Sequence, residues 1–566
     1  MHKNVFTSFV DWIVLCSTLA GIIFYGIWKS RGQKNIEGYL LGNQSLPWYH
    51  VMFSVMATQA SAITFLSAPG QAYTDGMRFV QYYFGLPLAM IVVAAVFIPV
   101  FHRLKVYTAY EYLENRFDSK TRSLAATLFL IQRGLGAGIT IYAPALILSS
   151  LLGWNIYLTN IVMGGLVIFY TVAGGTKAVS YTQLQQMTVI IIGMFIAGFM
   201  VVKMLPEDVS MTDALHVAGT MGKLNVITTD FNPNDKYNIW SGLIGGFFLA
   251  LAYFGTDQSQ VGRYLSGKSI AQSRTGMLLN GMVKIPMQFF ILLIGVLLFT
   301  FYQFHHRPIF FNKAAETTIL QSEYATQYKN LEREYNDLNE LKVGEIMSLI
   351  EEKRFELPTE GRKKSIQDAE NKMSELRTEA IQLIKKNDPT ADTNDTNYIF
   401  LHFVITFLPI GLIGLLIAVI FSASWSSTAS ELNALASTTV VDFIQRYGKK
   451  DRTERNVLMI SRLTTVGWGI IAIGVAMFAN RMGSLIEAVN VLGSLFYGTM
   501  LGIFLVAFMF KFIKGNAVFY AAILAEVVVV ILFIRDDAAF LWLNMIGCIA
   551  VILFSILIQT LIPKKS

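Results

Sequence analysis

The sequence predicts an all-α integral membrane protein with about thirteen transmembrane helices. Hydrophobic residues make up 54% of the chain and charged residues only 15%, and the mean hydropathy is +0.50. Soluble domains carry about a quarter charged residues. Apolar runs of about 20 residues, long enough to cross a bilayer, recur along the chain. Positive residues gather in alternate short loops between these runs, which is typical of a polytopic membrane protein.

The apolar runs define the predicted spans in chain order. They cover residues 8–28, 48–74, 79–101, 123–151, 155–174, 184–204, 238–257, 275–304, 398–422 (continuing as helix to about 440), 456–480, 483–510, 516–534 and 537–560. The first run has no basic stretch before it and no small-residue cleavage site. We therefore expect a retained helix and not a signal peptide.

Charge in the short loops predicts the topology. One set of alternate loops carries Lys29, Arg31, Lys34, Arg103, Lys105, Arg116, Lys120, Arg122, Lys177, Arg263, Lys268, Arg274, Arg446, Lys449, Lys450, Arg452, Arg455, Lys511, Lys514, Lys564 and Lys565. The opposite short loops carry little beyond Arg78, Lys223, Lys236, Arg481 and Arg535. Since positive loops stay in the cytoplasm, we expect an outside N-terminus and a cytoplasmic C-terminus in the plasma (bacterial inner) membrane. This bias explains the formal net charge of +7 without a nucleic-acid partner.

Other functional classes lack support in the sequence. Cys16 and Cys548 both fall in apolar runs, so neither a disulfide framework nor a metal site follows from them. The chain has no GxxxxGK[ST] and no HExxH motif, and its seven histidines are scattered. These features argue against ATP-driven transport and against an enzyme.

Residues 305–397 form a charged insertion that is too polar to span a membrane. Two heptad seams on either side of a turn at Leu357, Pro358 and Gly361 predict an antiparallel helical hairpin. The seams are Tyr324, Tyr328, Leu331, Tyr335 and Leu338, and Ile366, Ala369, Met373, Leu376, Ala380 and Leu383. We expect the hairpin outside the cytoplasm, because long loops cross regardless of charge. It is either a solvated insertion packed on the outer face or an arm that docks a partner.

The stretch SVMATQASAITFLSAPGQAYTDG, residues 54–76, occupies a predicted span but is poorly suited to face lipid. Small and polar residues crowd it, and Pro69 and Gly70 follow them. A bilayer offers no water to a loosened backbone, so a broken helix persists only where protein or a wet cavity surrounds it. In transporters, such helices bind ions and substrate near the midplane. We therefore expect this stretch to bind a cation and a small solute.

Six stretches carry a family resemblance. They are ASAITFLSAPGQAY (60–73), FIPVFHRLKVYTAYEYLENRF (97–117), IYAPALIL (141–148), YTVAGGTKAVSYTQLQQ (170–186), GTDQSQVGRYLSGKS (255–269) and SASWSSTASELNALASTTVVDF (422–443). Together and in this order they resemble the sodium:solute symporter family, which includes sodium-coupled transporters of glucose, sialic acid, iodide and monocarboxylates. The resemblance spans residues 8–560 apart from the insertion. The motifs most resemble those of the iodide and monocarboxylate branch.

The resemblance implies a LeuT-type fold of two five-helix inverted repeats, each with a broken first helix. The implied division is as follows: 1–47, an extra N-terminal helix and cytoplasmic linker; 48–204, the first repeat; 205–237, an extracytoplasmic loop; 238–304, the start of the second repeat; 305–397, the hairpin insertion; 398–510, the rest of the second repeat; and 511–566, two C-terminal helices and a short cytoplasmic tail.

The resemblance also implies a sodium site made of neutral oxygens. The family's backbone carbonyls from the first broken helix fall at Ala57 and Ala60. A later helix contributes the carbonyl of Ala423 and the hydroxyls of Ser426 and Ser427. The alternative for this serine pair is helix packing, or hydrogen bonding back to the preceding turn.

A second sodium site that some relatives carry is not expected here. Those relatives hold the ion partly with an aspartate, and the matching residue in this chain is Gln183. Ala429 also stands where a further hydroxyl would help. An amide and a methyl group are poor sodium ligands. We therefore expect one coupled sodium, with Gln183 on its release path.

Charged residues within the spans indicate a substrate path, since ionisable groups are costly in hydrocarbon. Arg133 is expected to hold a substrate carboxylate in bidentate fashion. The alternative is an internal ion pair, for example with Glu487. Lys284 matches a family lysine near the sugar site of glucose transporters, with a structural pair to Asp257 or Glu431 as the alternative. Glu431 itself is expected to be a hydrogen-bonded packing residue.

The family's remaining substrate positions carry over residue by residue. They are Gln59, Ser61, Thr64, Tyr82, Tyr83, Tyr253 and Asn490. The sugar-binding carboxylate of the glucose transporters falls at Tyr83, and another sugar-contacting amide falls at Ala250. Losing both disfavours a neutral hexose. Together with Arg133, this favours an organic anion, such as a monocarboxylate or an acidic sugar.

These inferences predict a sodium-coupled secondary active symporter that imports a small organic solute by alternating access. The sodium ion is the expected cofactor, and the partners are the solute and the lipid bilayer. The alternatives are a symporter of a neutral sugar or polyol, and a transporter-like solute sensor. A sensor would need a cytoplasmic output domain, and the predicted cytoplasmic loops are short.

Overall fold

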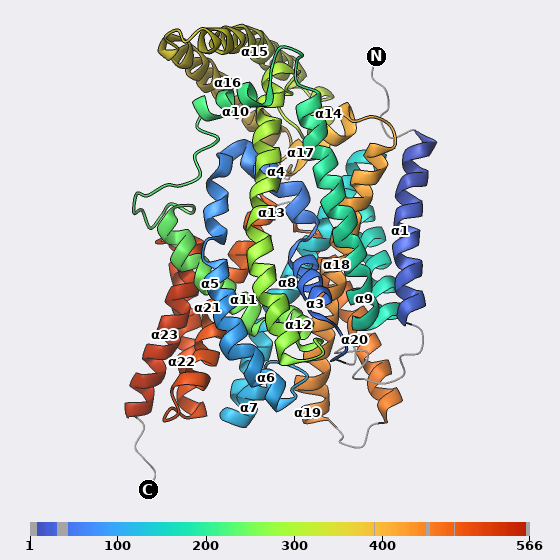
Figure 1. Cartoon of the computed structure of the whole chain (residues 1–566), viewed down its shortest axis with the longest axis vertical. Helices are drawn as coiled ribbons and strands as arrows, with labels where there is room; N and C mark the ends of the chain where they lie inside the picture. The colour runs from blue at the N-terminus through green and yellow to red at the C-terminus, as the bar shows by residue number, and fades with distance from the viewer. Residues whose placement is uncertain (1–7, 31–43, 390, 449–452, 480–481, 562–566) are drawn as a thin grey trace.

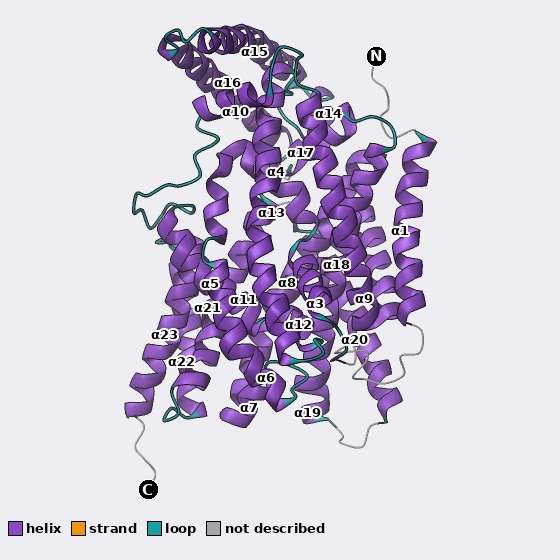
Figure 2. Ribbon diagram, viewed as in Figure 1, coloured by secondary structure: helices purple, strands orange, loops and turns teal. Residues whose placement is uncertain are grey.

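The computed structural model is a bundle of long helices that carries a helical hairpin at one end (Figure 1). It describes residues 8–30, 44–389, 391–448, 453–479 and 482–561. Within these ranges every regular element is helical (Figure 2), and the only β-type contact is an isolated bridge between Leu46 and Gly267. Of the cations used to predict the topology, Arg31, Lys34, Lys449, Lys450, Arg452, Arg481, Lys564 and Lys565, with the side chains of Lys29 and Lys177, lie outside what is described.

The described helices are connected mostly by short segments, with a longer one between Thr220 and Ser241. They are α1 (Phe9–Ser30), α3 (Trp48–Gln59), α4 (Ala62–Asp75), η2 (Gly76–Tyr83), α5 (Leu86–Val92), η3 (Val93–Phe97), α6 (Ile98–Leu104), α7 (Glu111–Arg116), α8 (Ser119–Leu152), α9 (Ile156–Lys203), α10 (Met211–Thr220), η4 (Ser241–Gly245), α11 (Gly246–Thr256), α12 (Gln258–Leu265), α13 (Ile270–Phe304), α14 (Lys313–Leu320), α15 (Ala325–Arg354), α16 (Glu360–Asn387), α17 (Thr396–Phe407), α18 (Leu412–Thr438), η5 (Thr439–Ile444), α19 (Gln445–Tyr447), α20 (Glu454–Ala476), α21 (Leu485–Met509), α22 (Gly515–Ile534) and α23 (Phe540–Leu561).

Ten helical stretches among the described residues are long and apolar enough to cross a membrane. They are Phe9–Gly26, Ala62–Leu104, Ser119–Leu152, Val179–Lys203, Ile270–Phe304, Leu412–Tyr447, Glu454–Ala476, Leu485–Met509, Gly515–Ile534 and Phe540–Leu561. Three shorter apolar helices accompany them, at Ile156–Val172, Ser241–Thr256 and Thr396–Phe407. All of these stretches overlap predicted spans, so the local hydropathy pattern located the membrane helices.

The predicted first broken helix is interrupted at Ala60 and Ser61, between α3 and α4. The Ser61 amide donates to the Gln59 carbonyl at 3.0 Å, and so it does not close a helical turn onto Ala57. Pro69 and Gly70 lie inside α4 and do not end it. A Cβ on Gly70 would lie 1.9 Å from the carbonyl oxygen of Thr396, so this glycine lets α17 approach closely.

A second helix breaks at Asp257, which separates α11 from α12 and has an extended backbone. The Asp257 carboxylate accepts hydrogen bonds from the amide of Ser259 at 2.8 Å and from its hydroxyl at 2.6 Å. It therefore caps α12 as an N-cap aspartate does. Both broken helices place free backbone groups and polar side chains inside the bundle, where protein surrounds them.

The span predicted at residues 398–422 is wrong in its bounds, because the helix stops within it. α17 ends at Phe407 and α18 begins at Leu412. Pro409 disfavours a helical conformation at Leu408, which is extended, and Gly411 has a φ of +89°. The Asp11 carboxylate of α1 accepts from the amides of Gly411 at 2.7 Å and Gly414 at 3.0 Å, and so ties the first helix to the start of α18.

The insertion contains two long helices, α15 and α16, that pack against each other at one end of the bundle (Figure 1). They are joined at residues 355–359, and Gly361 lies inside α16. The hairpin shares a separate core with the segments that flank it: Ile309, Phe310, Ile319, Tyr328, Tyr335, Met373, Leu376, Ala380 and Ile384. Several of the predicted seam positions are therefore the residues that hold the hairpin together.

Ion pairs of Glu370 join α16 to α15 and to Arg307, which follows α13. Glu370 accepts from Arg307 at 3.0 Å and from Lys342 at 2.6 Å. The Arg307 guanidinium lies 5.5 Å from the ring centroid of Tyr73 in α4. Burial alone would raise the pKa of Glu370, but the attraction of Arg307 and Lys342 outweighs it and holds that pKa well below 4.5. Burial lowers the pKa of Lys342 to about 8, against the opposing attraction of Glu370.

Glu370→Gln is expected to weaken the hairpin by about 3–5 kcal/mol, because it leaves two buried cations without their carboxylate. Hydrogen exchange in α15 and α16 measures this. In the wild type, the stability that Glu370 contributes is present above pH 4.5, the usual pKa of a glutamate. It is lost as the pH falls below that value. Lys342 costs stability increasingly as the pH falls from 10.5 to 8 and adds no further change below that. The exposed Glu375→Gln is the control, and equal exchange in the two variants would contradict the assignment.

Candidate substrate and sodium sites

A cavity of about 90 Å³ lies between the two broken helices and their neighbours. It brings together residues from α3, α4, η2, α8, α11, α13, α18 and α21. They are Thr58, Gln59, Ser61, Ile63, Thr64, Tyr82, Tyr83, Arg133, Thr140, Leu249, Tyr253, Lys284, Glu431, Ile486, Val489, Asn490 and Tyr497. All nine residues predicted to bind substrate line it. They come from distant parts of the chain, so folding is what assembles them.

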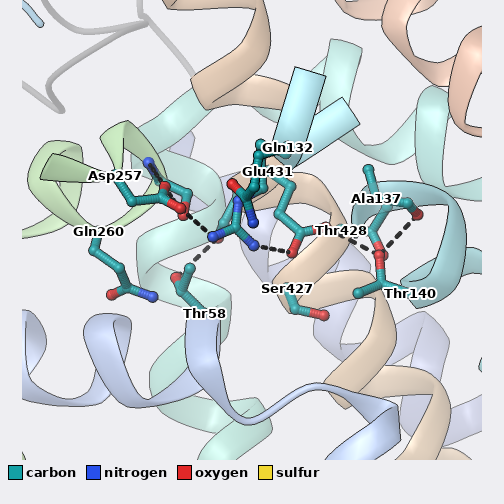
Figure 3. Close-up of polar contacts among 12 residues, drawn as sticks. Thr58, Gln132, Ala137, Thr140, Asp257, Gln260, Ser427, Thr428 and Glu431 are labelled. Atoms are coloured by element: carbon teal, nitrogen blue, oxygen red, sulfur yellow. Dashed lines mark hydrogen bonds and ion pairs between the residues drawn. The ribbon is translucent and has the colours of Figure 1, made fainter. Parts of the chain in front are cut away.

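The guanidinium of Arg133, in α8, is engaged by two carboxylates. Its Nη1 donates to Glu431 at 3.0 Å, and its Nη2 pairs with Asp257 and donates to the Tyr497 hydroxyl at 2.6 Å. Thr140 donates to the second Glu431 oxygen at 3.0 Å (Figure 3). The Tyr497 hydroxyl donates to Asp257 at 2.8 Å. The network thus joins α8, α18, α21 and the break between α11 and α12.

This network differs from the alternatives considered for the charged residues. Arg133 does form an internal ion pair, but with Asp257 and Glu431 and not with Glu487. Glu487 pairs with Lys236 instead. Glu431 is an ion-pair partner as well as a hydrogen-bonded residue. The carboxylates considered as partners for Lys284 are therefore already occupied.

Lys284, in α13, presents its ammonium group to the cavity with only 1% of the residue exposed. Its Nζ lies 5.9 Å from the ring centroid of Tyr83. Within the described part of the chain it has no carboxylate partner, because Asp257 and Glu431 both pair with Arg133. The ammonium group therefore faces the cavity without a direct ion pair among the described residues.

The remaining cavity wall is polar and aromatic. The Tyr82 hydroxyl donates to Asn490 at 2.8 Å, which joins η2 to α21 across the cavity. The Tyr253 hydroxyl accepts from Gln260 at 2.5 Å. The buried carbonyl oxygen of the Gln59 side chain has no hydrogen-bond partner among the described residues. These groups are suited to hold the polar atoms of a small solute.

Four of the five predicted sodium ligands, Ala57, Ala423, Ser426 and Ser427, lie where α3 passes α18. The Ser426 hydroxyl lies 3.4 Å from the Ala57 carbonyl, which the helix break leaves without its usual amide donor. The Ser427 hydroxyl donates to the carbonyls of Ala423 and Ser424, at 3.1 Å each. Ser427 thus hydrogen-bonds to the preceding turn of its own helix, which was the alternative to binding sodium. Ser426 instead reaches across to α3. Neutral carbonyl and hydroxyl oxygens are suited to sodium, because they solvate the ion without burying a second full charge.

Gln183, in α9, connects this region to both neighbouring helices. Its amide nitrogen donates to Ser430 at 2.8 Å and to Thr58 at 3.2 Å. The Ser54 hydroxyl donates to its carbonyl oxygen at 2.5 Å. The amide NH2 therefore lies between the hydroxyls of two neighbouring helices.

Two polar residues of the network around Arg133 were missing from the sequence predictions. Thr140 lies seven residues after Arg133 on α8, and Tyr497 lies seven residues after Asn490 on α21. Residues two helical turns apart share a face. Helical spacing from the predicted residues would therefore have identified both.

Comparison with known proteins supports the same family as the motifs. The model of the sodium:solute symporter family matches residues 39–328 and 376–525. The sodium-coupled monocarboxylate transporter 1 of Mus musculus is 29% identical over 505 residues, covering 88% of this chain and 69% of the relative. Its Homo sapiens counterpart is 27% identical over 507 residues, covering 89% and 69%. The human sodium/iodide cotransporter is 31% identical over 283 residues, covering 49% and 43%.

A solved structure agrees with the fold. The outward-open state of a Na+-coupled sialic acid symporter superposes with a TM-score of 0.75 at 24% identity, covering 98% of each chain. The family match omits residues 329–375, which form most of the α15–α16 hairpin. The chain therefore belongs to the sodium:solute symporter family, as a multi-pass membrane transporter with sodium as its coupling ion and not as an enzyme.

Proposed function

We propose that this chain imports a small organic anion together with sodium by alternating access. The observation that carries the proposal is the buried ammonium group of Lys284, which faces the cavity without a carboxylate partner among the described residues. A buried charge without a counter-ion is costly. A substrate carboxylate would supply that counter-ion.

The charges around the cavity support an anion further. Arg133 and Lys284 balance Asp257 and Glu431, so the four groups sum to zero. Adding one sodium ion leaves the occupied site with one positive charge. An anionic solute restores neutrality, and a neutral sugar does not. Since unbalanced charge is expensive in a low-dielectric interior, sodium and an anion favour each other's binding.

A monocarboxylate is favoured over an acidic sugar by the named relatives. Relatives named as monocarboxylate transporters match most of this chain. We therefore place a monocarboxylate first and an acidic sugar second. Arg133 would position the cavity wall. The solute would contact Lys284 and seven further residues: Gln59, Ser61, Thr64, Tyr82, Tyr83, Tyr253 and Asn490.

The proposal also includes the number of spans, their repeat arrangement and their orientation in the membrane. Thirteen spans would form two inverted repeats, with the repeat and loop boundaries expected from the sequence. α1 begins at the end of the bundle that carries the hairpin, and α23 finishes at the opposite end (Figure 1). An odd number of crossings separates two ends in this way. We place the hairpin end outside the cell, in the plasma or bacterial inner membrane, where the hairpin is positioned to meet an extracytoplasmic partner.

Uptake into proteoliposomes with an imposed sodium gradient tests the function. Monocarboxylates, acidic sugars and neutral sugars are compared at equal concentration. We expect sodium-stimulated accumulation of a monocarboxylate. Accumulation of neutral sugars alone would refute the anion proposal, and binding without any accumulation would favour a sensor.

Replacing Ser426 and Ser427 together with alanine is expected to raise the sodium concentration for half-maximal uptake about 100-fold or more. Each lost ligand to a charged group costs about 1.5–3 kcal/mol, and about 1.4 kcal/mol is tenfold in affinity. Sodium titration of uptake measures this. Ser437→Ala, on the same helix but outside the cluster, is the matched control. An unchanged sodium requirement would show that the ion binds elsewhere.

Gln183→Asp is expected to create a second sodium site. A carboxylate would replace the amide among Ser54, Thr58 and Ser430, where hydroxyl oxygens already converge. We expect the Hill coefficient for sodium to rise from about 1 toward 2, in line with two cooperating ions. Gln183→Asn keeps an amide, so its Hill coefficient for sodium should stay near 1. A wild-type coefficient near 2 would contradict the single-sodium proposal.

A further inference from the structure

Six lysine and arginine residues are buried in the described part of the chain, and four of them are neutralised by carboxylates. The six are Arg122, Arg133, Arg263, Lys284, Arg307 and Lys342. Ion pairs hold Arg122, Arg133, Arg307 and Lys342. The two without a carboxylate partner among the described residues are Lys284 and Arg263. Lys284 faces the central cavity, where the proposed function uses it. The proposed function gives Arg263 no role.

Arg263 lies in α12 with 3% of its surface exposed. Its one hydrogen bond among the described residues runs from Nη1 to the Ser180 hydroxyl at 3.4 Å, and its Nε has no partner there. Residues 173–178 of α9, whose side chains are not described, contain no acidic residue. An arginine in this state costs stability. Such a buried charge inside a membrane protein indicates a functional site.

The position of Arg263 relates it to the substrate cavity. Asp257, Gln260 and Arg263 are spaced three residues apart, so they follow one side of α12. Asp257 belongs to the Arg133 network, and Gln260 donates to Tyr253 in the cavity wall. Arg263 lies about 9 Å beyond Asp257 along the helix axis, at about 1.5 Å per residue. This polar stripe leads from the cavity toward the end of the bundle opposite the hairpin (Figure 1).

A second polar stripe meets it from α9. Ser180, the partner of Arg263, lies one helical turn before Gln183. Gln183 contacts Ser54, Thr58 and Ser430, beside the candidate sodium ligands. The guanidinium therefore lies just beyond the point where sodium would leave its site. There it attracts an anion and repels a cation.

We propose that Arg263 is a second anion-binding residue, which receives the substrate carboxylate as it leaves the cavity for the cytoplasm. Until that carboxylate arrives, the guanidinium repels sodium from the same exit. The residue thereby prevents sodium from passing without the anion. This inference rests on the proposed function, and it assigns a release-side station distinct from Lys284.

Arg263→Gln tests the inference, with pyruvate as the probe in proteoliposomes. We expect sodium-dependent pyruvate binding within twofold of the wild type, because the cavity is intact. The rate of pyruvate uptake should fall at least tenfold, and entry of radioactive sodium without pyruvate should rise at least threefold. Arg263→Lys keeps the charge and should keep sodium entry near the wild-type rate. Wild-type rates of both fluxes in Arg263→Gln, or a loss of binding as large as the loss of uptake, would overturn the inference.

A second pair of variants tests it if Arg263→Gln does not fold. Ser180→Asp places a carboxylate beside Arg263 and should occupy the station permanently. We expect it to reduce pyruvate uptake and raise sodium entry, while Ser180→Asn stays within twofold of the wild type. Equal behaviour of the two variants would overturn the inference. Failure of the wild-type protein to accumulate any carboxylate would instead refute the proposed function, so the two failures are distinguishable.

Discussion

Lys284→Gln is expected to raise the KM for a carboxylate substrate about 30-fold to 4,000-fold. Removing one partner of a buried charge pair costs about 2–5 kcal/mol, and about 1.4 kcal/mol corresponds to a factor of ten. The reason is that Lys284 supplies the unpaired positive charge of the cavity. Sodium-driven uptake at varied substrate concentration measures the effect.

The same variant separates a binding role from a structural one. No carboxylate is left unpaired when Lys284 is removed, since its neighbours Asp257 and Glu431 pair with Arg133. The melting temperature of the substrate-free protein should therefore stay the same or rise. Lys284→Arg retains the charge and should keep part of the affinity. An unchanged KM for carboxylates in Lys284→Gln would refute the role in anion binding.

Arg133→Gln is expected to destabilise the substrate-free protein by about 3–5 kcal/mol. It leaves the carboxylates of Asp257 and Glu431 buried without their cation, and breaking a buried ion pair on one side has that cost. Thermal unfolding in detergent measures the loss. If Arg133 acted only by binding substrate, the substrate-free protein would keep its stability.

A triple variant provides the control for this second prediction. Arg133→Gln combined with Asp257→Asn and Glu431→Gln removes all three charges together. We expect the triple variant to recover part of the stability lost in Arg133→Gln, since neither carboxylate is left buried without its cation. Additive losses would show that the three residues act independently. Pyruvate binding by the triple variant would then show whether Lys284 alone suffices to hold the anion.

Much of this protein is predictable from short stretches of its sequence. Hydropathy locates the spans because about 20 apolar residues are needed to cross a bilayer wherever they occur. The small and polar residues around Ala60 predict a broken helix for a similarly local reason. Local signals missed the stop at residues 408–411, although Pro409 and Gly411 stand there, because the apolar run continues on both sides.

The charges of the site were decided by tertiary structure. Arg133 meets Asp257 and Glu431 across separations of 124 and 298 residues. The sequence named these charged residues, but nothing in their spacing paired them. Only the packing of α8 against α18 and the α11–α12 break assigns both carboxylates to Arg133. That assignment leaves Lys284 without a carboxylate partner among the described residues, because an ion pair depends on which side chains meet inside the bundle and not on their order along the chain.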